Sequence, residues 1–316
     1  MKVNPLSLLY GAVVGGRNAL YERGILRSRA LQGPVVSVGN ISAGGSGKTP
    51  FVILLGELLK ARGIRFDVLS RGYGRGTRGV LLVDPGGMPR EFGDEPLLLA
   101  RRLQVPVVVG EDRYEAGVFA EARFGPQMHL LDDGFQHRGL ARDFDIVLVT
   151  PEDERDSLLP SGRLRESLGA LQRADAVVLT SGATAASFPL AGKTVWRLRR
   201  GMVAKDVPAR PVVFCGIARP KNFLLQLRAA GIDPIAEAFF RDHHAYSEKD
   251  VRDLLRLKEQ SEAGGFVTTE KDAVNLGGYL EALGPLAVVP VKMELADAAN
   301  AVDTMLLVIE ERRRGS

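Results

Sequence analysis

Residues 42–50 read Ser-Ala-Gly-Gly-Ser-Gly-Lys-Thr-Pro, a glycine-rich turn that ends in Gly-Lys-Thr. Glycines allow the backbone to curl so that several N–H groups point at phosphate oxygens. A helix that follows such a turn adds the positive end of its dipole. Lys48 is expected to reach the β- and γ-phosphates, and the Thr49 hydroxyl is expected to ligate Mg²⁺. The stretch therefore predicts a site for a nucleoside triphosphate.

The flanks of this turn support the prediction. Residues 34–39 form a short apolar run typical of a buried strand, Pro50 suits the first turn of a helix, and residues 51–62 are apolar at helical spacing. One position departs from the standard pattern, because Ser42 stands where a glycine is usual. The alternative is a glycine-rich surface turn. The residues expected to bind the nucleotide are Ser42, Ala43, Gly44, Gly45, Ser46, Gly47, Lys48 and Thr49.

Composition excludes several classes of protein. The chain has 316 residues, of which 45% are hydrophobic and 25% charged, enough for two domains with a sizeable core. Cys215 is the only cysteine, so a disulfide framework and a multi-cysteine metal site are excluded and a reducing compartment is expected. Residues 1–30 carry five basic side chains and one acidic, which accounts for the whole net charge of +4. The remaining chain is formally neutral, which argues against nucleic acid as a partner.

The N-terminal segment, residues 1–30, combines this positive charge with an apolar stretch over residues 5–14. The stretch is too short to span a membrane, which takes about 20 apolar residues. No cleavage pattern of a signal peptide stands out. A basic, apolar segment fits a helix that lies in the membrane interface. The alternative is a helix packed on the sheet, and the segment alone leaves both open.

Strand-like and helical stretches alternate along the chain, which predicts an α/β fold. The expectation is a P-loop NTPase-like, mostly parallel sheet with flanking helices, with ligands at the carboxyl ends of the strands. The clearest strands are expected at residues 35–38, 66–69, 80–83, 105–109, 128–131, 146–149 and 176–179.

The alternation breaks over residues 181–210, where small polar, extended basic and proline-containing runs follow one another. This break indicates a second, smaller α/β domain beyond it. The expected organisation is an N-terminal helix at 1–30, a P-loop kinase core at 31–190, a linker at 191–210 and a smaller domain at 211–316 that closes the active-site cleft. Within the smaller domain we expect strands at 212–215, 265–268 and 287–291 and helices at 221–230, 248–261 and 297–312.

Two aspartates end an apolar strand-like run at residues 128–134. In P-loop proteins an acid at the end of a neighbouring strand holds Mg²⁺, so Asp132 and Asp133 are candidate ligands. The alternative is a turn that uses Asp-Gly for its backbone preferences.

Two further strings carry groups that suit proton transfer. Asp94, in Gly-Asp-Glu-Pro at residues 93–96, could accept a proton from a hydroxyl, although the residues alone favour a simple helix start. His243 lies in Asp-His-His at 242–244, on a loop before a helix-capping sequence, and could assist a carboxylate. The alternative for His243 is a surface loop, and the string does not decide.

Two segments rich in arginine and glycine, residues 70–76 and 159–166, offer guanidinium groups that match phosphate oxygens. Either could equally be a solvated loop. Thr269 and Asp272 have the spacing of a helix cap.

Taken together, these strings resemble the tetraacyldisaccharide 4′-kinases, the lipid A 4′-kinases of Gram-negative bacteria. The resemblance covers nearly the whole chain. It rests on strings that occur in the family's order, namely Gly-Asn at 39–40, GGSGKTP at 44–50, SRGYGR at 70–75, GDEP at 93–96, DDGFQH at 132–137, LLPSGRLRE at 158–166, FCGIARP at 214–220, DHH at 242–244 and TTEKD at 268–272.

The resemblance implies a kinase that moves the γ-phosphate of ATP to the 4′-hydroxyl of a lipid disaccharide 1-phosphate. It implies that Asp94 is the catalytic base and that His243 forms a dyad with it, across a cleft between the domains. Asp132 and Asp133 fall on the family's pair of strand-end acids, and Ser42 is within the family's pattern. The implied place is the cytoplasmic face of the bacterial inner membrane, with the protein bound peripherally as a monomer.

With ATP and Mg²⁺ as cofactors, the expected metal ligands are Thr49, Asp132, Asp133 and Glu95. The residues expected to contact ATP or the lipid are Arg71, Arg75, His137, Arg163 and Arg165. Two rival functions remain open at this point, a P-loop kinase for a soluble metabolite and a nucleotide-switch or metal-insertion GTPase. Residues 269–272 have a superficial likeness to a guanine-binding motif, but they lie in the expected second domain.

Overall fold

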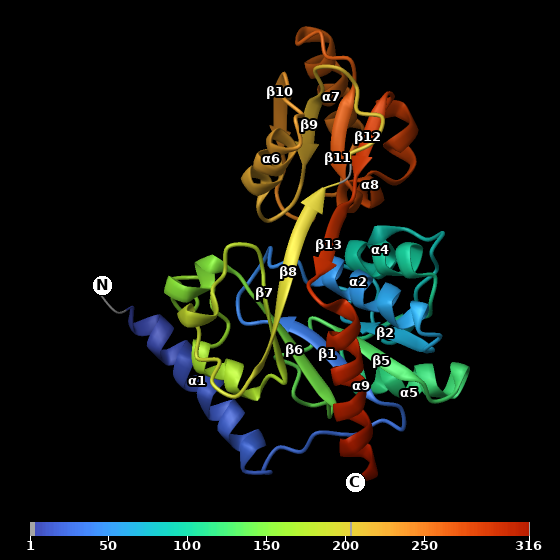
Figure 1. The fold of residues 1–316 in the computed structure, drawn as a ribbon. Helices are drawn as coiled ribbons and strands as arrows, with labels where there is room; N and C mark the ends of the chain where they lie inside the picture. The colour runs from blue at the N-terminus through green and yellow to red at the C-terminus, as the bar shows by residue number, and fades with distance from the viewer. Residues whose placement is uncertain (1–3, 203, 316) are drawn as a thin grey trace.

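The structure, a computed structural model, describes residues 4–202 and 204–315. Residues 1–3, 203 and 316, which belong to the expected segments 1–30, 191–210 and 211–316, lie outside the described residues. Within the described chain a larger domain is built on a 9-stranded sheet and a smaller domain on a 4-stranded sheet. Figure 1 shows the smaller domain above the larger one, joined to it through β8 Thr194–Met202 and β13 Val291–Leu295.

The larger sheet consists of β1 Val35–Asn40, β2 Phe66–Ser70, β3 Leu81–Leu82, β4 Val107–Val109, β5 Met128–Asp132, β6 Phe144–Val149, β7 Ala176–Leu179, β8 Thr194–Met202 and β13 Val291–Leu295. Their spatial order is β13-β8-β7-β6-β1-β5-β2-β4-β3. The edge strands β3 and β13 run antiparallel to their neighbours, and the strands between them are parallel. The sheet is therefore mostly parallel, as predicted.

Helices cover both faces of this sheet. Its central strands are therefore buried along their whole length. The helices of the larger domain are α1 Pro5–Glu22, α2 Lys48–Ala61, α3 Pro89–Phe92, α4 Asp94–Leu103, α5 Arg113–Phe124 and α9 Ala298–Arg314. Side chains of α2, α4 and α9 share one core cluster, and α5 contributes to a cluster on the other side. The glycine-rich turn follows the carboxyl end of β1, and Asp132 and Asp133 lie at the carboxyl end of β5.

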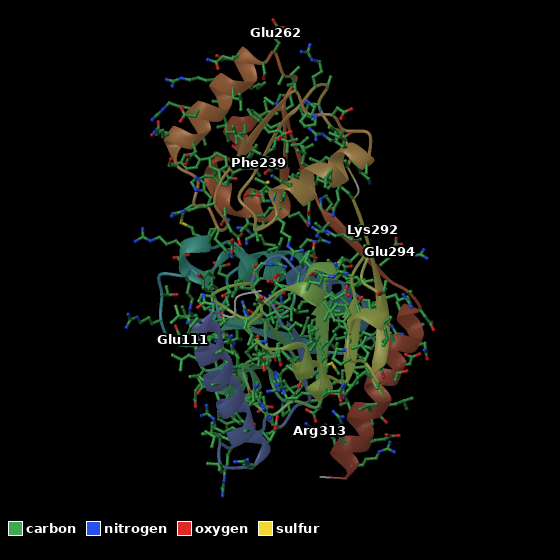
Figure 2. All side chains as sticks on the ribbon, turned by 90° about the vertical axis from the view of Figure 1, so that its left-hand side faces the viewer. Glu111, Phe239, Glu262, Lys292, Glu294 and Arg313 are labelled. Atoms are coloured by element: carbon green, nitrogen blue, oxygen red, sulfur yellow. The ribbon has the colours of Figure 1, made fainter. Side chains whose placement is uncertain are left out.

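The smaller domain has a parallel sheet in the order β10-β9-β11-β12. Its strands are β9 Val212–Cys215, β10 Ala236–Phe239, β11 Phe266–Thr269 and β12 Leu286–Val289, and its helices are α6 Pro220–Ala229, α7 Glu248–Gln260 and α8 Glu270–Leu276. A short 3₁₀ helix at Gly277–Leu283 also belongs to the smaller domain, whereas those at Pro151–Arg155, Leu168–Arg173 and Ala185–Ser187 belong to the larger one. Figure 2 places Glu262 at the far end of this domain and Arg313 at the opposite end of the molecule.

The linker expected over residues 191–210 is wrong over residues 194–202. Residues 194–202 form β8, which pairs parallel with β7 and antiparallel with β13. Trp196 and Leu198 are buried, whereas the basic residues between and after them are more exposed. The alternation of apolar and basic residues was thus the period-2 pattern of a strand with one buried face.

The boundary of the smaller domain also differs from the expected 211–316. The strand predicted over 287–291 is two strands, β12 and β13, on either side of Pro290, and β13 returns to the larger sheet. Helix α9 then packs on the larger core through Val302, Met305 and Ile309. The domains are thus connected by β8 and β13 side by side, and Lys292 and Glu294 lie at this connection (Figure 2).

Helix α1 lies against the larger domain by one face. The Ser7 hydroxyl donates to the carbonyl of Leu158 at 3.0 Å, and the Tyr10 hydroxyl donates to the carbonyl of Arg165 at 3.1 Å. The opposite face carries exposed apolar side chains, Leu6, Leu8, Leu9 and Val13. Within residues 4–202 and 204–315, none of the helices combines the length and the apolar character that a membrane span requires.

Candidate active site

The predicted phosphate-binding turn joins β1 to α2. Gly44, Gly45 and Gly47 have φ angles of 74°, 61° and 87°, a region that side chains disfavour. The Asn40 side chain donates to the Ser46 hydroxyl at 2.8 Å and so braces the turn from inside. Because α2 begins at Lys48, its first N–H groups face the turn. The local geometry is that of an anion site at a helix N-terminus.

Lys48 is held above this turn by two oxygens. Its Nζ lies 3.1 Å from Oδ1 of Asn40 and 3.3 Å from Oδ1 of Asp133. Thr49 follows in the first turn of α2 and is buried. Ser42 is buried as well, and its backbone forms a bridge with Leu164. The amine and hydroxyl expected to meet phosphate and metal therefore sit at the end of β1.

Asp132 is the last residue of β5, next to β1 in the sheet. Its Oδ2 accepts from the Ser70 hydroxyl at 3.3 Å, whereas its buried Oδ1 has no hydrogen-bond partner among the described residues. Burial, together with the charges of Glu95 and Asp133, raises the pKa of Asp132 to about 7. A buried carboxylate oxygen without a partner is suited to a cation.

Asp133 follows with a φ of 50° and meets two cations. Arg165 Nη1 lies 3.0 Å from Asp133 Oδ2, on the side chain that Lys48 also contacts. Burial acts to raise the pKa of Asp133, but Lys48 and Arg165 outweigh it and lower that pKa. Asp133 is thus ionised and already paired.

A magnesium ion fits these donors only in part. Across the described residues, no three His, Cys, Asp or Glu side chains stand close enough to hold a metal. Mg²⁺ in nucleotide sites takes one or two carboxylates, and phosphate oxygens and water complete its shell. Asp132 with its unpartnered oxygen, and the Thr49 hydroxyl, suit that partial role.

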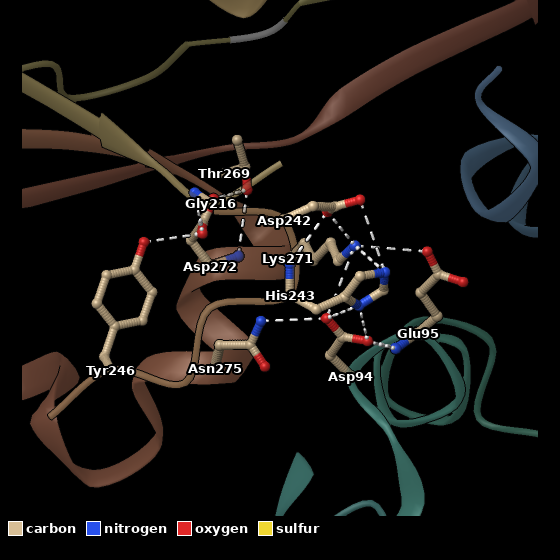
Figure 3. A network of polar contacts seen from close by, with 10 residues as sticks. All are labelled: Asp94, Glu95, Gly216, Asp242, His243, Tyr246, Thr269, Lys271, Asp272 and Asn275. Carbon is tan, nitrogen blue, oxygen red and sulfur yellow. Dashed lines mark hydrogen bonds and ion pairs between the residues drawn. The ribbon is translucent and has the colours of Figure 1, made fainter. Parts of the chain in front are cut away.

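Asp94 and His243 meet across the two domains. Asp94 begins α4 and is 5% exposed, and His243 follows β10 on a loop, with a φ of 57°. His243 Nδ1 lies 3.0 and 2.9 Å from the two carboxylate oxygens of Asp94 (Figure 3). The contact joins residues 149 positions apart in the chain.

Two residues of α8 complete this cluster (Figure 3). Lys271 Nζ lies 3.2 Å from Nε2 of His243 and 3.0 Å from Oδ1 of Asp242, and Asn275 donates to Asp94 at 3.1 Å. The bond to Asp94 raises the pKa of His243, which burial and Lys271 oppose. Burial acts to raise the pKa of Asp94, but His243 and Lys271 outweigh it and lower that pKa. Asp94 is therefore ionised near neutral pH.

A buried carboxylate anchors α8 behind the cluster. Asp272 accepts from the backbone N–H of Gly216 at 2.7 Å, from the Tyr246 hydroxyl at 2.9 Å and from the Thr269 hydroxyl at 2.5 Å (Figure 3). Thr269 in turn accepts from the Asp272 N–H at 3.1 Å, so the predicted cap is confirmed. This network fixes the start of α8, and with it Lys271.

The five residues expected to contact substrate are not all brought together. Arg165 lies beside Asp133, but Arg75 pairs with Glu111 at 2.8 Å and Arg163 with Asp156 at 2.7 Å. The two other positions are Arg71, which is exposed, and His137, which is half-buried. Burial and the charge of Arg113 lower the pKa of His137 to about 4.

Sequence reasoning missed several residues of the site. The sequence assigns no site role to Lys271, which lies in the string of the predicted cap, or to Asn40, which belongs only to the resemblance. Arg113 is buried near the strand-end acids, and burial together with Arg71 lowers its pKa to about 10. Lys271, as the lysine between two acids of a helix start, carried a signal, whereas Arg113 carried none.

Comparison with known proteins agrees with this geometry. A family model described as tetraacyldisaccharide-1-P 4′-kinase matches residues 1–310. A tetraacyldisaccharide 4′-kinase of Koribacter versatilis is 51% identical over 321 residues, covering 98% of this chain and 100% of that one. The chain belongs to the tetraacyldisaccharide-1-P 4′-kinase family.

Solved structures and further relatives extend the comparison. The chain resembles a crystal structure of LpxK from Aquifex aeolicus in complex with ATP, with a TM-score of 0.79, 35% identity and coverage of 96% of this chain and 97% of that one. A tetraacyldisaccharide 4′-kinase of Geobacter metallireducens is 38% identical over 327 residues, covering 95% of this chain and 96% of that one. The predicted family and P-loop NTPase-like fold are confirmed.

Family membership also decides between the functions left open by the sequence. The protein is an ATP-dependent kinase of lipid A biosynthesis that phosphorylates a tetraacyldisaccharide 1-phosphate at the 4′ position. A kinase for a soluble metabolite and a GTPase switch are no longer candidates. ATP and Mg²⁺ are the predicted cofactors that this family uses.

Proposed function

We propose that the 4′-hydroxyl is activated between the two domains by Asp94, with His243 as its partner. The observation that carries the proposal is the contact of one imidazole nitrogen with both oxygens of a buried carboxylate. The contact is not part of the local structure of either residue. Asp94 is the first residue of a helix in one domain, and His243 lies in a loop of the other. Lys271 links the pair to Glu95 at 3.6 Å, whose charge acts on Asp132 in turn.

The roles follow from the charges. A sugar hydroxyl is a poor acid, so its proton acceptor must be close, ionised and aligned. Asp94 is ionised because its pKa is lowered, and His243 holds both its oxygens in place. The hydroxyl proton moves to a carboxylate oxygen of Asp94, and Lys271 stabilises the negative cluster.

The larger domain supplies the phosphate site. The backbone of residues 43–48 and the Lys48 amine neutralise the triphosphate. Thr49 and Asp132, with Asp133 or Glu95 beside them, would hold Mg²⁺, which would supply positive charge to neutralise the triphosphate. Arg165 keeps Asp133 oriented.

For the lipid substrate, we propose Arg71, His137 and Arg165 as the first contacts. Arg71 is exposed and Arg165 lies beside the strand-end acids. Arg75 and Arg163 remain candidates, and each of them, like Arg165, is paired with a carboxylate that a phosphate would have to displace. The low pKa of His137 keeps its ring neutral, so it would act by hydrogen bonding.

The place of action is part of the proposal. We infer that the protein binds peripherally, as a monomer, to the cytoplasmic face of the inner membrane. Helix α1 supports this, because its outward face is apolar and basic residues surround its end. A helix of that kind lies in the headgroup region of anionic lipid.

A double-mutant cycle tests the dyad with ATP and a lipid disaccharide 1-phosphate in mixed micelles. Asp94→Asn and His243→Gln should each lower kcat by about 10²–10⁴-fold, with a smaller change in KM for ATP. The double variant should be little worse than the worse single variant, because the two groups act as one unit.

Arg252→Gln, on the exposed face of α7, is the matched control and should keep wild-type kcat. The melting temperature of every variant is measured in parallel. Losses that multiply in the double variant would separate the two residues. A stability loss of about 1 kcal/mol with normal turnover would reduce Asp94 to a helix-start residue.

A further inference from the structure

Arg219 of the smaller domain lies directly against the phosphate-binding turn. It precedes α6, and a Cβ placed on Gly45 would come within 2.9 Å of its Nε. A Cβ on Gly44 would likewise lie 3.5 Å from the Cβ of Ala218. The segment before α6 therefore covers the turn, and glycines in the turn leave room for it.

The Arg219 guanidinium is only partly used. Its Nη1 pairs with Glu152 at 3.2 Å, on the 3₁₀ helix after β6. Its Nη2 is buried and has no hydrogen-bond partner among residues 4–202 and 204–315. A buried N–H donor of a charged group is costly to leave unpaired, so this donor calls for an acceptor.

Arg200 adds a second cation with the same feature. It lies in β8 opposite Met293, and antiparallel partners face the same side of a sheet. The Met293 methyl group lies against Gly47, because a Cβ added to Gly47 would be 2.7 Å from it. The side of the sheet that Met293 and Arg200 share therefore faces the phosphate-binding turn. The Nε of Arg200 is buried and, within the described chain, also without a partner.

The two arginines repel each other. Burial and the charge of Arg219 lower the pKa of Arg200, and like charges side by side destabilise a fold unless an anion lies between or beside them. The carboxylate of Glu152 offsets only one of them, and it is half-exposed. Two cations with spare donors beside a phosphate-binding turn point to a phosphate group.

We propose that Arg219 contacts the γ-phosphoryl group of ATP as an arginine supplied in cis by the smaller domain, with Arg200 behind it. The inference rests on the proposed function and deepens it. The γ-phosphoryl is the group that fits, because the domain that carries Arg219 also carries His243, the partner of the proposed base. During transfer the bond from the β–γ bridging oxygen to phosphorus breaks, a bond to the 4′-oxygen forms, and Asp94 takes the proton. Arg219 takes no proton and neutralises the charge that spreads over the phosphoryl oxygens.

Nucleotide binding without lipid tests this separately from turnover. Arg219→Gln keeps much of the side chain and loses the charge, and Arg228→Gln, exposed on the same α6, is the matched control. Calorimetry with Mg²⁺ and either ADP or the imido analogue of ATP gives the preference for a γ-phosphate. Arg219→Gln should reduce that preference at least tenfold and kcat by about 10³-fold, and Arg228→Gln should change neither.

Equal weakening of both nucleotides, or of adenosine as well, would overturn the γ-phosphoryl contact. Normal kcat in Asp94→Asn would refute the proposed base, while the binding ratio of the two nucleotides would still decide the role of Arg219.

Arg200→Met supplies a stability measurement. Without nucleotide it should raise the melting temperature, because it removes a buried cation and its repulsion with Arg219. It should also reduce the increase in melting temperature that the imido analogue produces. A melting temperature that falls, with an undiminished response to the analogue, would show that Arg200 only supports the fold and would overturn the anion site.

Discussion

At the scale of single residues, the site depends on carboxylates held in opposite states by their surroundings. Asp132 and Asp133 are neighbours in the chain, yet burial raises the pKa of the first and two cations lower that of the second. The difference arises because Lys48 and Arg165 both contact Asp133, whereas Asp132 accepts one hydrogen bond from a hydroxyl and its other oxygen has no partner within the described chain. One acid is therefore paired by the protein and the other awaits a cation.

Asp132→Asn tests this division. Because the folded-state pKa of Asp132 lies above its unfolded value, its charge costs stability above the unfolded pKa, and the variant should raise the melting temperature without metal. The same variant should raise the Mg²⁺ concentration needed for half-maximal kinase activity at least tenfold. Thermal melts and Mg²⁺ titrations of activity check both. Unchanged Mg²⁺ dependence would show that Asp132 belongs only to the turn.

A buried histidine between two carboxylates should make the stability of the protein depend on pH. His129 is fully buried, and its Nδ1 lies 2.8 Å from Asp67 and its Nε2 3.3 Å from Glu121. Burial acts to lower the pKa of His129, but the two carboxylates outweigh it and raise that pKa. This stabilisation is complete below the unfolded pKa of about 6.5 and is lost as pH rises through the folded pKa.

We therefore expect the free energy of unfolding to fall as pH rises above about 6.5, by about 1.4 kcal/mol for each unit of pKa difference. Urea denaturation at a series of pH values measures it. His129→Gln should remove the part of this slope that lies above about pH 7, where Asp132 is already ionised. It should leave kcat unchanged, because residue 129 lies near the start of β5, away from the site. A slope that persists in the variant would assign the pH dependence to other groups.

At the scale of elements, α1 shows how one helix serves two environments. Its inward face is polar, with Ser7, Tyr10 and Asn18 bonded to the larger domain, the last to Glu166 at 2.6 Å. Its outward residues Leu6, Leu9, Val13 and Leu20 recur at helical spacing and are 38–64% exposed. The apolar side chains of α1 are on its exposed face, and its polar side chains face the domain. This arrangement indicates that the exposed face contacts lipid.

Leu9→Asp with Val13→Asp should weaken binding to vesicles that contain anionic phospholipid at least tenfold. The fold should persist, because both side chains are more than 60% exposed. Sedimentation with vesicles measures the binding, and Leu307→Asp, an equally exposed leucine on α9, is the control. High salt should also weaken the wild-type protein. Equal binding by all three proteins would end the interfacial role of α1.

At the scale of the whole molecule, the site exists only while the two domains touch. Helices α4 and α8 contact each other where the domains meet, and there Arg102 pairs with Glu270 and also with Glu57 at 3.3 Å. The same two helices carry Asp94 and Lys271. A change in how the domains dock therefore moves the proposed base relative to its partner.

Charge reversal tests this coupling without touching the dyad. Arg102→Glu and Glu270→Arg should each lower kcat/KM for the lipid about fivefold, since partly exposed pairs contribute about 1 kcal/mol or less. The double reversal should recover part of the loss, because it restores the pair of residues 102 and 270 in the opposite sense, while Glu57 loses its cation. Steady-state kinetics of the three variants measures it. Additive losses would mean that Arg102 and Glu270 act separately.

The sequence by itself determined the parts that depend on neighbours in the chain. The phosphate-binding turn, most strand positions and the cap of α8 follow from glycines, apolar runs and hydroxyl–acid spacing, which constrain the backbone locally. The tertiary structure decided what local patterns do not contain. The sequence around Asp94 predicts only a helix start, and the contact with His243 is what indicates a further role. Likewise, β13 belongs to the larger sheet because it pairs with β8. Contacts between distant residues depend on how whole elements pack, and no short pattern encodes that packing.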